Sequence, residues 1–236
     1  MSKKLALVFG GSRGIGAACV QSLVDAGFDV ACTYVSNTPA SLPPGAQPFR
    51  VDVCDAQQVS SAFDQASSAF GRPVDVVLAN AGINVPPAPV GQFPADRFRQ
   101  LMEVNLFGAF NVLAESARRV ADGGSIIALT TSMVRVAVPG GGPYTASKAA
   151  VESLVRSMSR ELAPRGIRVN AVAPGPVDTD LFHAGKTDEA RQKSAALSPF
   201  NRIGRPEEVA EVVVFLASER ASWVHGQVVQ PNGGMV

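Results

Sequence analysis

A tyrosine and a lysine four residues apart carry the clearest chemical signal in the sequence: Tyr144 and Lys148, in the segment YTASK. On a helix, residues at this spacing lie on one face, so their side chains are neighbours. A free tyrosine has a pKa of about 10, and favouring its phenolate near neutrality requires ~4 kcal/mol. A neighbouring ammonium contributes to that stabilisation. The pair therefore predicts a general acid/base at Tyr144, which gives a proton to a nascent alkoxide or takes one from an alcohol.

A hydroxyl that could orient a carbonyl lies twelve residues before this tyrosine. Ser132 follows a predicted strand, and the carboxyl ends of strands in a parallel sheet face the ligand crevice. We expect its hydroxyl to hold the substrate oxygen beside Tyr144. Thr131 is adjacent and is the alternative for this role. Taken alone, Ser132 would be interpreted as a turn residue, because hydroxyls are common where strands end.

A glycine-rich turn follows the first apolar run and opens a helical pattern. Its residues are Gly10, Gly11, Ser12, Arg13, Gly14, Ile15 and Gly16. Glycines permit a sharp turn and let a pyrophosphate approach the helix N-terminus, where free N–H groups favour anions. A plain tight turn is the alternative, but the strand–turn–helix context favours dinucleotide binding.

The residues after the second predicted strand distinguish between the two nicotinamide cofactors. An NAD site usually places an acid about twenty residues beyond the glycines. Here the segment 33–37 reads TYVSN, so Tyr34 and Ser36 stand where that acid would lie. Arg13 in the glycine turn could pair with a 2′-phosphate. We therefore expect NADP(H), the alternative being that Arg13 is only a solvated surface residue.

Alternating strand and helix patterns would position these groups. The predicted strands are 5–9, 30–34, 49–53, 74–79, 126–130 and 168–173, with a seventh starting at 228–229, and the predicted helices are 15–26, 56–70, 95–120, 144–163 and 207–217. This order predicts a Rossmann-type doubly wound parallel sheet of about seven strands with helices on both faces. Four prolines within 38–48 exclude an ordinary helix between the second and third strands.

The composition excludes several other classes of protein. Hydrophobic residues make up 46% and charged residues 17% of 236 residues, and the net charge is +1, so neither disorder nor a nucleic-acid surface is indicated. No segment has the ~18 apolar residues of a membrane helix. The three cysteines form no CxxC motif and are interpreted as small buried hydrophobes in a reducing compartment. The two histidines are far apart, so no metal site is expected.

These motifs together resemble the short-chain dehydrogenase/reductase family, in particular its 3-ketoacyl-carrier-protein reductase-like branch. The residues that carry the resemblance are the glycines of the turn, Asn80-Ala81-Gly82, Asn105, Ser132, Tyr144 with Lys148, the segment 167–175 and Asn232-Gly233-Gly234. The resemblance covers essentially the whole chain. One departure is Phe9, where the family usually has threonine; we expect a rearranged hydrogen bond there and an intact cofactor site. The short segment 38–48 is a second departure.

The resemblance implies roles for further residues. Asn105 would hold a water that links Lys148 to solvent and completes a proton relay. The implied cofactor contacts, besides the glycine turn, Tyr34, Ser36, Tyr144 and Lys148, are Asp52 and Val53 at the adenine, Asn80, Ala81 and Gly82 after the fourth strand, and Pro174, Gly175, Val177 and Thr179 over the nicotinamide, with Thr179 on its carboxamide. From the residues alone, Asp52 is equally a strand-end cap and Asn105 an ordinary polar helix position.

The implied function is NADPH-dependent reduction of a carbonyl, a 3-ketoacyl thioester or similar ketone, to a secondary alcohol. An NADP-dependent alcohol dehydrogenase and a non-catalytic NADP(H)-sensing regulator are the alternatives. We expect one domain over residues 1–236 with a substrate lid at about 180–200, a cytoplasmic homotetramer, and neither nucleic-acid nor membrane partners. Basic residues near the lid could form a rim for a carrier protein or could simply be solvated; they are Lys186, Arg191, Lys193, Arg202 and Arg205.

Overall fold

The computed structural model describes residues 3–36, 38–39 and 41–236. Its centre is one parallel sheet in the order β3-β2-β1-β4-β5-β6-β7. The strands are β1 (Leu5–Phe9), β2 (Asp29–Tyr34), β3 (Ala46–Arg50), β4 (Val76–Ala79), β5 (Ser125–Leu129), β6 (Arg168–Val172) and β7 (Val228–Val229). The order reverses between β1 and β4, where a doubly wound sheet opens its ligand crevice. The predicted fold class is confirmed.

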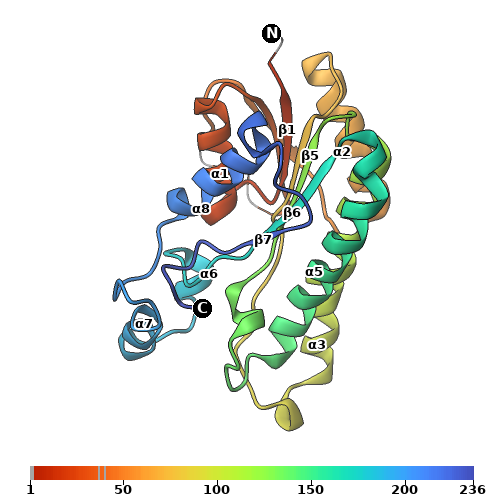
Figure 1. Ribbon diagram of the computed structural model, residues 1–236. Coiled ribbons are helices and arrows are strands. Elements are labelled where there is room, and N and C mark those ends of the chain that lie inside the picture. The colour runs from red at the N-terminus through yellow and green to blue at the C-terminus, as the bar shows by residue number, and fades with distance from the viewer. Residues whose placement is uncertain (1–2, 37, 40) are drawn as a thin grey trace.

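Helices cover both faces of this sheet (Figure 1). On one face lie α1 (Gly14–Asp25) and α8 (Pro206–Ala217), and on the other α2 (Ala56–Phe70), α4 (Ala109–Arg119) and α5 (Gly142–Leu162). The remaining helical elements are α3 (Ala95–Met102), α6 (Asp180–His183), α7 (Asp188–Ala195), the π turn η2 (Glu103–Gly108), and the 3-10 turns η1 (Val90–Gln92), η3 (Ser132–Arg135), η4 (Ala163–Arg165) and η5 (Glu219–Ala221).

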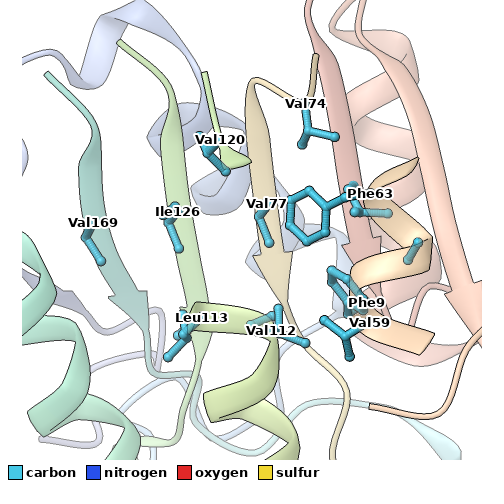
Figure 2. Packing of buried hydrophobic residues seen from close by; sticks show 14 of the residues in the cluster. Phe9, Val59, Phe63, Val74, Val77, Val112, Leu113, Val120, Ile126 and Val169 are labelled. Carbon is cyan, nitrogen blue, oxygen red and sulfur yellow. The ribbon is translucent and has the colours of Figure 1, made fainter. Parts of the chain in front are cut away.

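Apolar strands buried on both sides hold the layers together. Figure 2 shows Phe9 of β1 beside Phe63 of α2, with Val77 and Ile126 on the neighbouring strands. The centroids of the Phe9 and Phe63 rings are 6.1 Å apart, and both side chains are fully buried. Burying a Phe or Ile side chain contributes about 1.5–3 kcal/mol, so this packing fixes the sheet edge that carries the functional residues.

The third strand begins earlier than the sequence predicts. We expected residues 49–53, whereas β3 spans Ala46–Arg50 and places Pro48 opposite Cys32 of β2. Proline is tolerated because β3 is an edge strand, with no neighbour on its outer side to receive an N–H bond. The described residues between β2 and β3 contain no helix, as the prolines predict. Asn37, the last residue of the segment 33–37, and Ala40, in the proline-rich segment 38–48, lie outside the described residues.

Two short helices, α6 and α7, lie in the segment expected to form a lid, where no helix was predicted. Threonine side chains start both of them. Thr179 accepts a hydrogen bond from the N–H of Phe182 (3.1 Å), and Thr187 from that of Ala190 (3.3 Å). Such caps were visible in the sequence, but helices this short lack a readable apolar period. Within the described part of the chain, no helix is long and apolar enough to cross a membrane.

Candidate active site

The predicted catalytic helix presents Tyr144 and Lys148 at the carboxyl edge of the sheet. Lys148 is only 6% exposed, and its Nζ donates a 2.9 Å hydrogen bond to the carbonyl of Leu129 at the end of β5. Burial lowers the pKa of Lys148 to about 8, so the amine remains mostly protonated at neutral pH. Burial also raises the pKa of Tyr144 to about 12. The described residues alone therefore do not lower the Tyr144 pKa as we expected, because burial disfavours the charged phenolate.

Asn105 lies in the π turn between α3 and α4, where one uninterrupted helix was predicted. Its side chain is fully buried and pairs with the backbone of Ile83, accepting from the N–H (2.8 Å) and donating to the carbonyl (2.9 Å). A Cβ added at Gly82 would lie 3.1 Å from Asn105 Oδ1 and 3.3 Å from Lys148 Nζ. The loop after β4 thus joins the π turn to the catalytic helix, and π turns frequently occur at functional sites.

The glycine turn forms a backbone cradle that larger residues would fill. A Cβ at Gly16 would lie 2.0 Å from the carbonyl oxygen of Gly10, and one at Gly10 would lie 2.9 Å from the Cα of Ala81. Asn80 donates to the Gly10 carbonyl at 2.7 Å, which brings the loops after β1 and β4 together. The α1 N-terminus receives no side-chain cap, so its first N–H groups can bind an anion. This cradle fits the pyrophosphate of a dinucleotide.

Phe9 does not disturb this turn. Its side chain points into the core, and the Gly10 N–H instead donates to the hydroxyl of Thr33 at 3.1 Å. This is the rearranged hydrogen bond that the sequence led us to expect.

Two arginines are candidates for the expected adenosine end of the cofactor. Arg13 is exposed, and its side chain forms no hydrogen bond or ion pair with the described residues. Arg50 lies opposite Tyr34 in the β2–β3 register, and its Nε donates to the carbonyl of Val35 at 3.2 Å, next to Ser36. We did not select Arg50 from the sequence, because only the strand register brings it beside Ser36.

The predicted adenine residues differ in what they contact. Asp52 accepts a hydrogen bond from the N–H of Cys54 (2.9 Å), which is the strand-end role left open as its alternative. Val53 is 4% exposed and packs against Gly108. Near Ser12, a cavity of about 260 Å³ separates α1 from the proline-rich loop, lined by Gly11, Ser12, Ala17, Val20, Gln21, Pro39, Ser41, Leu42 and Pro43.

Three consecutive hydroxyls follow β5 and have different partners. Thr130 donates to Glu152 on α5 at 3.1 Å. Ser132 is fully buried, donates to the carbonyl of Ala173 at 2.6 Å and accepts from the amide of Asn232 at 3.0 Å. Thr131 accepts from the N–H of Met133 at 3.3 Å, and its hydroxyl proton has no acceptor among the described residues. Ser132 is therefore held by the chain itself, which favours Thr131 as the hydroxyl available to a ligand.

The loop after β6 crosses from the catalytic residues to the glycine turn. The carbonyl of Pro174 accepts a hydrogen bond from the Ser132 N–H at 2.9 Å. A Cβ added at Gly175 would lie only 3.0 Å from the Cα of Asn232, and Val177 is 5% exposed. A Cβ at Gly14 would lie 3.2 Å from the methyl group of Thr179. Thr179, which precedes the expected lid, therefore lies against the glycine turn. Both were expected to contact the cofactor.

The basic residues of the lid are mostly paired within the chain. Arg191 pairs with Asp188, Lys193 with Glu189, and both Arg202 and Arg205 with Glu208. Lys186 lies 3.5 Å from the centroid of the Phe182 ring. These partners reduce the positive charge that the rim could offer to an acidic protein.

Comparison with known proteins agrees with this geometry. A family model described as enoyl-(acyl carrier protein) reductase matches residues 10–236. An NADPH-dependent aldehyde reductase-like protein, chloroplastic, of Arabidopsis thaliana is 38% identical over 257 residues, covering 100% of this chain and 95% of its own length. A cis-4-hydroxycyclohexanecarboxylate dehydrogenase of Sinomonas cyclohexanicum is 36% identical over 242 residues, covering 99% and 96%.

A solved short-chain dehydrogenase/reductase from Serratia marcescens BCRC 10948 superposes with a TM-score of 0.90 at 33% identity, covering 98% of this chain and 97% of that one. The match extends over the sheet, the glycine turn and the catalytic helix. The chain belongs to the short-chain dehydrogenase/reductase family and is an oxidoreductase acting on CH–OH and C=O groups.

Proposed function

We propose that this protein reduces a carbonyl to an alcohol with NADPH, using Tyr144 as the general acid. The observation that carries the proposal is the position of Tyr144 and Lys148 at the sheet edge that also holds the glycine cradle, with Gly82 in contact distance of Lys148. NADPH, when bound, supplies the hydride. The 38% identical Arabidopsis relative, whose name specifies NADPH-dependent aldehyde reduction, supports this direction.

The chain's own residues handle the proton. Tyr144 is neutral below its raised pKa of about 12, so it can donate to the developing alkoxide. Lys148 is charged below its pKa of about 8 and stabilises the phenolate that remains. Asn105 fixes the loop at Ile83. After Lys148 returns a proton to the Tyr144 phenolate, a water held by Asn105 would reprotonate Lys148 from solvent. Thr131 holds the substrate oxygen, while Ser132, our first expectation for this role, keeps the turn in place.

The cofactor preference rests on the adenosine end. Arg50 provides a guanidinium group next to Ser36, and Arg13 provides a second one in the glycine turn. Guanidinium groups bind phosphate in a bidentate geometry. The acid that selects NAD is replaced by Tyr34 and Ser36. The remaining expected contacts stay as proposed: Gly10, Ser12, Gly14, Ile15 and Gly16 at the pyrophosphate, Asp52 and Val53 at the adenine, Asn80, Ala81 and Gly82 along the cofactor, and Pro174, Gly175, Val177 and Thr179 at the nicotinamide.

The substrate is proposed to be a ketone or aldehyde carried on a small molecule, including short 3-ketoacyl thioesters. The paired charges of the lid argue against docking of an acidic carrier protein. The Sinomonas relative, named as a dehydrogenase of a cyclic alcohol, keeps alcohol oxidation as the second candidate. A non-catalytic NADP(H) sensor is the third, and it would not require the pairing of Tyr144 with Lys148.

We assign the chain one catalytic domain over 1–236, with the lid at about 180–200 closing over the substrate, and we propose a cytoplasmic homotetramer. Phe107 and Phe110 are 54% and 50% exposed on the continuous π and α4 helix, and their spacing puts them on one face. Large exposed apolar side chains that cluster mark interaction surfaces. We propose that the face carrying Phe107 and Phe110 contacts the same face of a second copy of this chain.

The first test follows NADPH absorbance at 340 nm, and separately NADH absorbance, with a short 3-ketoacyl thioester and an aldehyde panel. Native protein is compared with Tyr144→Phe. NADPH turnover that the substitution abolishes would support the proposal. Turnover with NADH alone would contradict the assignment of Arg13 and Ser36. Tight NADPH binding without turnover of any carbonyl or alcohol would favour the sensor.

A further inference from the structure

A buried carboxylate lies one helical turn beyond the catalytic lysine. Glu152 is 2% exposed and follows Tyr144 and Lys148 at the same spacing of four residues, so all three share one face of α5. Side chains at this spacing have Cβ atoms about 5–6 Å apart, close enough for a lysine and a glutamate to pair. Yet Lys148 donates to the carbonyl of Leu129. Glu152 has a different cation as its partner.

That cation is Arg135, the last residue of η3. Its Nη1 donates to Glu152 Oε1 at 3.0 Å and its Nη2 to Oε2 at 2.9 Å, a two-pronged contact that fixes both oxygens. The hydroxyl of Thr130 supplies a third hydrogen bond. The carboxylate is thereby fully satisfied without Lys148.

One further titratable group among the described residues contacts the buried face of α5: His225, whose Nε2 lies 2.6 Å from the carbonyl oxygen of Ser159, seven residues beyond Glu152. Charged residues on the elements packed against it either are exposed or have partners elsewhere: Asp96, Arg97, Arg99 and Glu103 are exposed, Glu115 pairs with Arg118 and Arg119, Arg165 with Asp122, and Arg168 donates to carbonyls near α8. On α5 itself, Arg156, Arg160 and Glu161 are exposed. Arg135 is therefore the described cation that competes with Lys148 for Glu152.

We propose that Arg135 is a positioning residue whose pairing with Glu152 prevents that carboxylate from capturing Lys148, so that the lysine charge remains available to Tyr144. The inference rests on the proposed function, because it concerns the proton that Tyr144 transfers. It goes beyond the proposed function by assigning a role to Arg135 and Glu152, which the proposed reaction does not use. Burial is the cause of the lowered Lys148 pKa of about 8, as expected for a lysine whose charge has no acidic partner.

Removing the arginine alone should misdirect the lysine. In Arg135→Met, Glu152 loses its cation while remaining buried, and Lys148, one helical turn away on the same face of α5, is the cation we expect to replace it. Lys148 then leaves Leu129, and its charge is compensated, so the Tyr144 phenolate is less stabilised. We expect kcat for reduction to fall about tenfold or more, and the acid limb of kcat for alcohol oxidation to move up by about one pH unit, with KM changing less than threefold.

Removing the carboxylate as well should restore activity. Arg135→Met with Glu152→Gln has no carboxylate to capture Lys148, so we expect its kcat to return to within about threefold of Glu152→Gln alone. Arg118→Met is the matched control, because Arg118 pairs with the buried carboxylate of Glu115 on α4. It should lower the unfolding midpoint without moving kcat or the pH profile. A double variant as slow as Arg135→Met, or a control that loses kcat equally, would overturn the proposal.

A crystal structure of Arg135→Met separates this inference from the proposed function. Lys148 Nζ within hydrogen-bond distance of the Glu152 carboxylate supports the exchange of partners, whether or not a substrate has been found. Nζ still on the Leu129 carbonyl overturns it. Failure of the native protein to oxidise NADPH with any carbonyl would count against the proposed function alone. The position of Lys148 Nζ in the Arg135→Met crystal structure would still test the exchange of partners.

Discussion

The side-chain amide of Asn232 donates a 3.0 Å hydrogen bond to the hydroxyl of Ser132, which lies one hundred residues earlier in the chain. This contact fastens the C-terminal segment to the turn after β5. Because Ser132 also donates to Ala173, its hydroxyl has both its roles filled by protein atoms. The neighbouring Thr131 is left with an uncommitted proton at the same sheet edge.

Substituting each hydroxyl should therefore separate catalysis from stability. Thr131→Val keeps the shape of the side chain, and we expect kcat to fall about 10²-fold, the usual loss for one donor to a developing oxyanion. Ser132→Ala leaves buried partners unsatisfied, so it should cost about 1–3 kcal/mol of unfolding free energy while kcat falls less than tenfold. Steady-state kinetics and urea unfolding measure both. The reverse pattern would return the catalytic role to Ser132.

The buried lysine should destabilise the fold at neutral pH. Its pKa is about 8 in the folded protein, against 10.5 for a solvated lysine. The unfolded chain therefore holds this proton more tightly, and stability rises as pH increases from about 8 to about 10.5. Lys148→Met should abolish turnover and raise the unfolding free energy by about 3 kcal/mol at pH 7, a gain that shrinks towards pH 10.

Urea unfolding at pH 7 and pH 9.5 measures that gain. Tyr144 is considered at the same time, because its raised pKa of about 12 makes the fold lose stability between about pH 10 and 12, above both measurements. Lys193→Met, an exposed lysine on the lid, is the matched control and should show no such pH-dependent difference. Equal stability of Lys148→Met and native protein at pH 7 would contradict the prediction.

The two arginines at the adenosine end should distinguish the cofactors. Arg13→Gln and Arg50→Gln each remove charged hydrogen bonds to a 2′-phosphate, worth about 1.5–3 kcal/mol, so the Kd for NADPH should rise about tenfold or more. The Kd for NADH should change less than twofold. Calorimetric titration with 2′,5′-ADP provides a readout independent of turnover. Arg99→Gln on the exposed face of α3 is the control, and an unchanged NADPH affinity in Arg50→Gln would remove this residue from the site.

The features that could be predicted from the sequence are those encoded locally. Apolar runs such as Leu5–Phe9 were enough to predict the strands. The four-residue spacing of Tyr144 and Lys148 was enough to predict that both lie on one face of a helix. Arg50 was missed because its place beside Ser36 depends on strand register. The choice between Thr131 and Ser132 likewise depends on Ala173 and Asn232, which hold the Ser132 hydroxyl and are distant in sequence. Long-range hydrogen bonds decide such questions, and no local pattern encodes them.

The exposed phenylalanines predict how copies of the chain assemble. Phe107→Asp with Phe110→Asp places charge on the face proposed to meet a second copy, where an unpaired buried charge is strongly unfavourable. We expect the particle mass in solution to fall below that of the native protein, which we propose to be a tetramer, as measured by light scattering after size exclusion. Gln65→Asp adds charge to an exposed position on α2 and should leave the mass unchanged. A native protein that is already monomeric would contradict the tetramer, and both phenylalanines would then need another partner.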